Sequence, residues 1–294
     1  MDDTTAGASP PSEPNLESFS LPGWDNTVPV THDSGITQSQ ILNFRGFDTW
    51  QKTLQSSLKR QKFSDHEFNA DPYELKSIEI QSYDLVGRLE ALPHQKRPLF
   101  IKLRAKVENA KGEDIPAVVF LRGGSVAVLI IVRPTDSLDE RYVIMTEQAR
   151  IPAGSLSFME IPAGMIDPKD DSFGGTAARE LEEEVGLKLK EQDLINMTEL
   201  ALKGHETEES LQNAMYPSPG GCDEFISIYL WEKEMDRMQI DGLRGKLGGE
   251  RSEREHIRIR LLNYEKLLQV GARDGKTLAA WSLYEYLKRT RQIK

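Results

Sequence analysis

The sequence predicts an α+β fold in which helices cover a mixed β-sheet. Residues 77–86 and 98–107 alternate apolar and polar side chains, which is typical of half-buried antiparallel strands. Residues 117–120, 126–132 and 142–146 are short, strongly apolar runs, as expected for buried strands of a mixed sheet. Segments with helical periodicity alternate with these strands, and this order indicates a layered α+β domain.

The beginning of the chain divides into a tail and a helix. Residues 1–38 hold few large apolar residues and several Pro, Ser and Thr, which predicts a disordered tail. Residues 39–63 carry apolar side chains three and four positions apart, which predicts an amphipathic helix. These side chains are Phe47, Trp50, Leu54 and Leu58. We expect residues 39–112 to form a region of this helix and the two alternating strands.

The main domain is expected to span residues 113–294. A short strand at residues 159–161 leads into an acidic helix, and residues 225–231 and 256–262 supply further strands. A last helix is predicted over residues 277–291. Its inward side chains are Leu278, Trp281, Leu283 and Leu287.

Composition argues against two classes of partner. The 294 residues are 38% hydrophobic and contain no apolar run approaching the roughly 18 residues of a membrane span. The net charge of −10 argues against a nucleic-acid partner, because such binding depends on Lys and Arg neutralising phosphates. A polyanionic small molecule would instead have to enter with a metal ion.

The compartment is indicated by the single cysteine and by the first residues. Cys222 excludes an internal disulfide and fits a reducing environment. The first dozen residues lack the features of a transit or secretory peptide. As it stands the chain is expected in the cytoplasm, or in a plastid if a transit peptide has been removed.

The acidic helix carries the strongest functional signal. Glu180, Glu183 and Glu184 share one helical face, whereas Glu182 projects roughly the other way. Like charges so close raise one another's pKa and are costly unless a cation neutralises them. Oxygen ligands favour Mg²⁺ or Mn²⁺, and Mg²⁺ commonly binds through a few carboxylates together with substrate phosphates. The competing interpretation, a solvated acidic face, is typical of an arbitrary Glu-rich helix.

The segment Arg179-Glu180-Leu181-Glu182-Glu183-Glu184-Val185-Gly186-Leu187 resembles the second half of the Nudix box. The upstream half is a variant, with Asp171 and Gly164 at its acidic and glycine positions. The resemblance implies an α/β/α sandwich with a mixed sheet. It also implies that Glu180 and Glu184 hold Mg²⁺, that Glu183 supports catalysis, and that Arg179 orients these acids.

Over residues 113–291 the chain is most similar to the ADP-ribose and ADP-sugar diphosphatase branch of that family, plant-type enzymes included. In the string Glu147-Gln148-Ala149-Arg150 the resemblance implies that Arg150 holds the substrate. In the string Glu160-Ile161-Pro162-Ala163-Gly164-Met165 it implies a metal-binding carbonyl at Ala163 and a substrate contact at Met165. By the same resemblance Arg122 contacts a phosphate, with an exposed strand-end arginine as the alternative.

Two loops complete the predicted site. Ser218, Pro219, Gly220 and Glu224 resemble the family's loop against the nucleotide sugar, although a generic turn would look the same. Hydrolysis also needs a base to activate water. Glu250, Glu253 and Glu255 precede the strand at His256, and the resemblance implies Glu253 as base and Glu255 as metal ligand.

The expected function is therefore Mg²⁺-dependent hydrolysis of a nucleoside diphosphate sugar, ADP-glucose or ADP-ribose, to AMP and a sugar phosphate. Three alternatives stay open: a sensor that binds ADP-ribose without hydrolysing it, a diphosphatase that prefers UDP-glucose, and an mRNA-decapping enzyme, which the acidic charge disfavours. Kinship also implies a homodimer formed through the strands before residue 113.

Overall fold

The computed structural model describes residues 15–87, 91–137, 139–166, 172–205, 209–249 and 256–294. The chain divides into two compact units after Leu121. The predicted boundary after residue 112 is thus too early. The reason is that the short strands at Asp114–Ile115 and Val118–Leu121 both pair with the strand at Arg97–Glu108.

The N-terminal unit contains one sheet, covered on one face by two helices. The sheet order is β1-β2-β3-β4-β5, and β6 also pairs with β4. The strands are β1 (Leu16–Ser20), β2 (Pro29–Asp33), β3 (Glu74–Val86), β4 (Arg97–Glu108), β5 (Asp114–Ile115) and β6 (Val118–Leu121). β2 runs parallel to β3, and the other pairs are antiparallel. The predicted antiparallel strands correspond to β3 and β4.

The prediction of a disordered tail is wrong for the described residues after position 14. β1 and β2 occupy this segment, and the side chains of Val28, Val30 and Ile36 are buried. Although apolar residues are sparse here, these three pack into the core, and Val30 pairs with Ile78 of β3. Residues 1–14 lie outside the described residues.

Two helices replace the single helix predicted over residues 39–63. α1 (Gln38–Asn43) ends, and α2 (Arg45–Arg60) begins, at Phe44, whose backbone is extended. The predicted inward face is confirmed: Phe47 is fully buried in the core of this unit, and Trp50, Leu54 and Leu58 pack against it.

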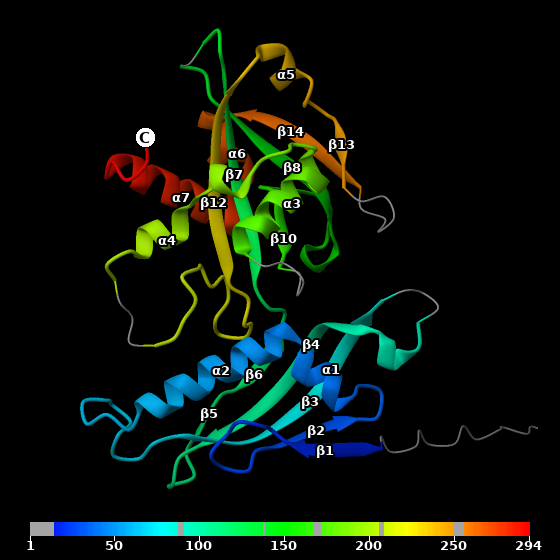
Figure 1. Ribbon diagram of the computed structural model, residues 1–294, viewed down its shortest axis with the longest axis vertical. Helices are drawn as coiled ribbons and strands as arrows, with labels where there is room; N and C mark the ends of the chain where they lie inside the picture. The colour runs from blue at the N-terminus through cyan, green and yellow to red at the C-terminus, as the bar shows by residue number, and fades with distance from the viewer. Residues whose placement is uncertain (1–14, 88–90, 138, 167–171, 206–208, 250–255) are drawn as a thin grey trace, which may run out of the picture. The chain divides into compact units, whose positions relative to one another are not determined.

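The C-terminal unit is built on a mixed sheet (Figure 1). Its order is β11-β12-β7-β8-β14-β13, with β10 paired to β7 and β9 to β8. The strands are β7 (Ser125–Pro134), β8 (Tyr142–Arg150), β9 (Ser155–Glu160), β10 (Ala163–Met165), β11 (Ile195–Asn196), β12 (Ile226–Met235), β13 (Leu247–Gly248) and β14 (Ile257–Asn263). The β12–β7 pair is parallel and the other pairs are antiparallel.

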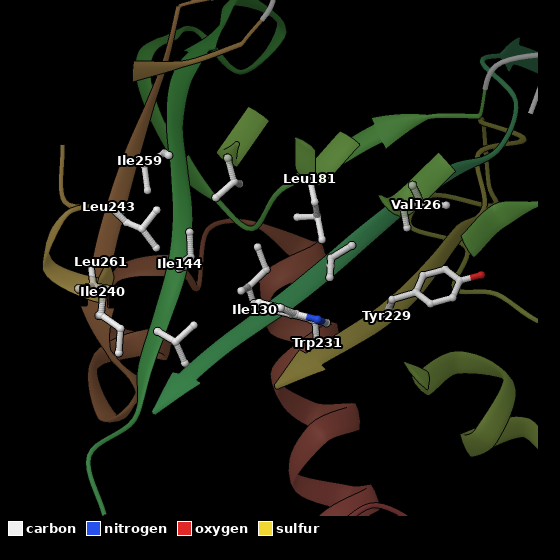
Figure 2. Packing of buried hydrophobic residues seen from close by; sticks show 14 of the residues in the cluster. Val126, Ile130, Ile144, Leu181, Tyr229, Trp231, Ile240, Leu243, Ile259 and Leu261 are labelled. Carbon is white, nitrogen blue, oxygen red and sulfur yellow. The ribbon is translucent and has the colours of Figure 1, made fainter. Parts of the chain in front are cut away.

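Helices cover both faces of this sheet. α3 (Phe173–Val185) and α5 (Arg237–Asp241) pack on one face, which Figure 2 shows with Leu181 of α3 against Val126 and Ile130 of β7. α4 (Met197–Leu202), α6 (Leu267–Gly271) and α7 (Gly275–Arg289) pack on the other. Successive residues of β7 alternate between the two cores. The predicted α/β/α sandwich is confirmed.

Among the described helices, none is both long enough and apolar enough to cross a membrane.

Candidate active site

α3 is fixed at both ends by its own sequence. Ser172 caps the N-terminus, where its hydroxyl accepts a hydrogen bond from the Gly175 amide. Gly186 ends the helix in the left-handed region, with φ of 73°, and its amide donates to the Glu182 carbonyl. Gly186 therefore caps the C-terminus of α3.

The acids of α3 lie in different environments. Leu181 and Val185 are buried against the sheet, and Glu184, beside them, is only 5% exposed. The Glu183 side chain is 40% exposed, and its Oε2 lies 3.0 Å from Nη1 of Arg179. Glu182 is exposed and pairs with Lys188. Among the three acids of α3 whose side chains the structure describes, Glu184 alone is buried.

Part of the predicted set of metal ligands and catalytic acids lies outside the residues that the structure describes. The Glu180 main chain belongs to α3, but its side chain, Glu253 and Glu255 lie outside the described residues. Within the described part of the chain, no three acidic, histidine or cysteine side chains converge on a possible metal position. The set of ligands proposed from the sequence therefore stays a prediction.

Ala163 presents its carbonyl away from β7. The Val128 amide donates to the Pro162 carbonyl, and the Ile166 amide donates to the Gly124 carbonyl. Peptide groups alternate in direction along an antiparallel ladder, so the carbonyl of Ala163 points to the side that β7 does not occupy. Met165, two residues on, is half-buried on the same strand.

Gly248 and Gly249, which precede Glu253 and Glu255 in the sequence, contact the end of α3. A Cβ atom at Gly248 would lie 1.8 Å from the carbonyl oxygen of Glu184, so only glycine allows this approach. The next amide, of Gly249, donates to the Glu183 carbonyl at 3.1 Å. Gly248 and Gly249 thus lie against the main chain at the end of α3.

Arg122 is held by residues that follow the predicted substrate loop. Its Nε lies 3.0 Å from Oε1 of Glu224, the same oxygen that accepts a hydrogen bond from the Ser125 hydroxyl at 3.1 Å. Asp223 accepts hydrogen bonds from the Arg122 and Gly123 amides and so fixes the backbone. Burial raises the pKa of the Asp223 carboxyl above its ordinary value. The predicted residues Arg122 and Glu224 are thus brought together.

The segment of Ser218, Pro219 and Gly220 forms an exposed turn. The Ser218 carbonyl accepts hydrogen bonds from the amides of Gly221 at 3.2 Å and Cys222 at 3.0 Å. A Cβ atom at Gly220 would have open space around it, so no neighbouring group requires a glycine there. The turn delivers the chain to Asp223, and its contact with a substrate stays a prediction.

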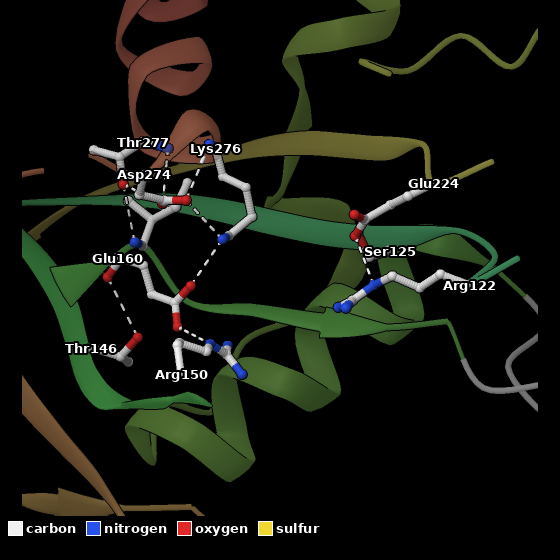
Figure 3. Close-up of polar contacts among 10 residues, drawn as sticks. Arg122, Ser125, Thr146, Arg150, Glu160, Glu224, Asp274, Lys276 and Thr277 are labelled. Atoms are coloured by element: carbon white, nitrogen blue, oxygen red, sulfur yellow. Dashed lines mark hydrogen bonds and ion pairs between the residues drawn. The ribbon is translucent and has the colours of Figure 1, made fainter. Parts of the chain in front are cut away.

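Arg150 belongs to a network of charges around the buried Glu160 (Figure 3). Its Nε lies 2.6 Å from Oε1 of Glu160, and Nζ of Lys276 lies 2.8 Å from Oε2 of the same carboxylate. Lys276 also contacts Oδ1 of Asp274 at 2.8 Å. Burial by itself would lower the pKa of Lys276, but the attraction of Glu160 and Asp274 outweighs it and raises that pKa. In Figure 3 the side chains of Arg150 and Arg122 extend toward one another from opposite sides of the view.

Three residues of these clusters were missed by the sequence analysis, namely Asp223, Asp274 and Lys276. Asp274 is the N-cap of α7, where it accepts hydrogen bonds from the Lys276 and Thr277 amides. An aspartate just before a periodic helix is a recognisable start signal. It locates the helix end but does not reveal that Lys276 reaches Glu160.

Comparison with known proteins found one matching family model and several similar proteins. The NUDIX domain model matches residues 123–282. The chain is 36% identical to the Nudix hydrolase 14, chloroplastic, of Arabidopsis thaliana over 93% of this chain and 82% of the relative. It is 32% identical to the ADP-ribose pyrophosphatase of Bacillus subtilis over 43% of this chain and 55% of that protein. A crystal structure of an ADP compounds hydrolase matches 75% of this chain and 99% of its own with a TM-score of 0.42 and 18% identity.

The family model covers more than half of the chain, and the plant relative aligns along most of both sequences. The resemblance stated from the box residues is thereby confirmed. The chain belongs to the Nudix hydrolase family and is an enzyme of that family.

Proposed function

We propose that this enzyme hydrolyses the diphosphate bond of nucleoside diphosphate sugars, ADP-glucose or ADP-ribose, to AMP and a sugar phosphate. One observation carries the proposal: in the unit that holds α3, the two arginines that the resemblance assigns to phosphate and substrate, Arg122 and Arg150, each have Nε within 3.0 Å of a glutamate oxygen. Two guanidinium groups suit a diphosphate, because terminal N–H groups pair well with phosphate oxygens. The name of one relative, the ADP-ribose pyrophosphatase of Bacillus subtilis, agrees with this substrate class.

The donor set fits a divalent metal ion. Glu184 supplies a buried carboxylate and Ala163 an outward carbonyl, and oxygen donors of this kind are what Mg²⁺ and Mn²⁺ prefer. We propose that they hold Mg²⁺ together with Glu180 and Glu255. When bound, Mg²⁺ would offset the negative charge of the phosphates and acidify a water molecule.

The remaining roles fall to the chain itself. Arg122 and Arg150 hold the phosphate oxygens, and Arg179 steadies Glu183 across one helical turn. Glu253 takes a proton from the attacking water, whose oxygen forms a new bond to one phosphorus as the anhydride bond breaks. Both products then carry a terminal phosphate. Met165, Ser218, Pro219 and Gly220 are proposed to contact the nucleotide sugar.

A substrate panel tests this function. We expect AMP to appear from ADP-glucose and ADP-ribose with Mg²⁺ and to vanish when a chelator is added. UDP-glucose as the best substrate would instead support the UDP-glucose alternative. Binding of ADP-ribose by calorimetry without any product would support the sensor alternative and remove the proposal.

Variants of α3 make the test specific. We expect Glu184→Gln to lower kcat by about a thousandfold, since removing groups that stabilise developing charge costs two to three orders of magnitude. Glu182→Gln is the matched control, because Glu182 lies on the same helix but pairs with Lys188. Equal activity of these two variants would contradict the assignment of Glu184.

We also propose that the N-terminal unit forms a homodimer. The face of its sheet away from the helices exposes Val118 and Phe120 of β6, and the Phe120 ring lies 5.1 Å from that of Phe100. Exposed aromatic residues of this kind are typical of interfaces. Light scattering should give twice the mass of one chain, and Phe120→Lys should shift it toward a monomer. A monomer in the parent protein would contradict the proposal.

The compartment is a separate proposal. The name of the plant relative includes the word chloroplastic, and we propose a plastid location on this basis. A fluorescent fusion to the full-length product would show plastid signal, whereas diffuse cytoplasmic signal would favour the other expectation.

A further inference from the structure

Glu160 is almost completely buried between two cations. It is 2% exposed, and each of its carboxylate oxygens has its own partner: Oε1 has Arg150 and Oε2 has Lys276. A buried carboxylate is costly unless its charge is compensated. Lys276 therefore supplies compensation that Arg150 would otherwise have to provide alone.

The geometry of the Arg150 contact leaves much of its guanidinium for a ligand. Glu160 engages Nε, whereas most of the N–H donors of an arginine lie on its two terminal nitrogens. The Arg150 side chain is 39% exposed, so part of it reaches solvent. Held in this way, the guanidinium plane has a fixed direction.

The contact of Arg150 with only one oxygen of Glu160 depends on Lys276. A carboxylate with both oxygens available binds arginine as a two-bond fork, which uses a terminal nitrogen as well as Nε. Lys276 occupies Oε2 and thereby limits Arg150 to a contact with Oε1. Removal of the Lys276 ammonium would let Arg150 turn inward onto Glu160 and would take a terminal nitrogen away from a phosphate.

The lysine is itself fixed by the first turn of α7. Asp274 is buried and contacts Nζ of Lys276, and its other oxygen accepts a hydrogen bond from the Thr277 hydroxyl at 2.7 Å. The Thr277 hydroxyl in turn accepts a hydrogen bond from the Ile161 amide at 3.2 Å. The start of α7 thus contacts both the Glu160 side chain and the backbone that follows it.

We infer that Lys276 is a positioning residue that acts through Glu160 to keep the terminal nitrogens of Arg150 directed at the substrate's diphosphate. The inference rests on the proposed function. Lys276 itself does not touch the substrate.

The test compares KM and kcat for ADP-ribose in four purified full-length proteins. These are the parent, Lys276→Met, Lys276→Arg and Lys288→Met. Lys276→Met should raise KM about tenfold, the effect of losing one charge-assisted hydrogen bond, with kcat within about threefold of the parent. Lys276→Arg should restore most of the affinity. Lys288 is the matched control, because it lies on the same helix and pairs with Glu232 rather than with this network.

A double-mutant cycle then tests the route. If Lys276 acts through Arg150, Lys276→Met should change the KM of an Arg150→Met enzyme by less than about twofold. Independent, additive effects of the two substitutions would overturn the inference, as would a Lys276→Met enzyme that matches Lys288→Met.

Two outcomes separate this inference from the proposed function. A parent protein that turns over no nucleotide sugar removes the proposed function, whereas an active parent with unaltered Lys276 variants removes only the role of Lys276. If circular dichroism shows that Lys276→Met does not fold, Lys276→Gln takes its place. A rise in KM for Lys276→Gln that Lys276→Arg reverses supports the inference, and no rise overturns it.

Discussion

Arg122 and Arg150, the two arginines proposed to bind the diphosphate, form similar ion pairs in different surroundings. Arg122 and Arg150 are each held by a glutamate at Nε, at 3.0 Å and 2.6 Å. The Glu224 side chain is 18% exposed, and its other partner is the neutral Ser125 hydroxyl. Glu160 is buried, and its other partner is a lysine. The comparison teaches that an arginine–glutamate pair can be a local contact in one place and part of a charge network around a buried carboxylate in another.

The two ion pairs should differ most in the free energy of unfolding that is lost when the glutamate is replaced by glutamine. Glu160→Gln would leave Lys276 and Arg150 facing a neutral amide in a buried position, so we expect a loss of about 3 kcal/mol in the free energy of unfolding. Urea denaturation followed by circular dichroism measures it. A loss no greater than that of Glu224→Gln would show that the two clusters are equivalent after all.

A smaller effect is expected at the partly exposed pair. Glu224→Gln should lower the free energy of unfolding by less than about 1 kcal/mol, as is usual for ion pairs that water reaches. This loss should shrink further in about 1 M salt, where screening acts over only a few ångströms, while the loss for Glu160→Gln should persist. Salt-dependent denaturation of both variants, with Glu182→Gln as a surface control, checks the contrast. Equal salt sensitivity would contradict it.

The smallest predicted effect concerns pH, and its sign differs from that of a typical paired carboxylate. Because burial raises the pKa of Asp223, the folded state binds a proton more tightly than the unfolded chain. Protonated Asp223 therefore contributes fully to the free energy of unfolding at pH values below 3.8, the ordinary pKa of an aspartate. This contribution is lost as the pH rises through the raised pKa of Asp223. The pKa of Lys276 is also raised, so the contribution of its charged form to stability is complete below pH 10.5. That contribution is lost only at more alkaline pH, as the pH rises through the raised pKa.

Thermal melting across the acid range tests this prediction. Relative to Asp223→Asn, the parent should gain stability as pH is lowered toward 3.8. Lys276→Met should follow the parent over the same range. A parent that loses stability relative to Asp223→Asn on acidification would contradict the sign.

Local patterns predicted most strands of the main sheet and its helices α3 and α7, because alternation and helical spacing are consequences of backbone geometry. They did not predict α4, α5 and α6, and the run at residues 117–120, expected in the main sheet, pairs with β4 of the N-terminal unit. These patterns failed for elements whose formation depends on contacts with residues distant in the sequence. β1 and β2 form although their apolar residues are few, since β2 joins β3, and Phe44 interrupts a helix whose periodicity continues through it. Neither feature is visible in a short window of sequence.

The candidate site shows the same division. Arg122, Arg150 and Glu224 follow from local strings, and the structure brings Arg122 to Glu224. Lys276 is 116 residues from Glu160, and nothing in the sequence near either residue indicates that they meet. Likewise, helical spacing groups Glu183 with Glu184, whereas their different burial depends on the sheet beneath α3.

The contact of Gly248 with the Glu184 carbonyl has a consequence for how this enzyme could diversify. Because the departure point of the following segment is locked to the helix, substitutions or insertions after Gly249 would leave the origin of that segment in place. The attachment of this segment to α3 is therefore independent of the length and sequence of the residues that follow Gly249. Relatives could exchange the acids and the length of this segment to suit new substrates while keeping the same attachment.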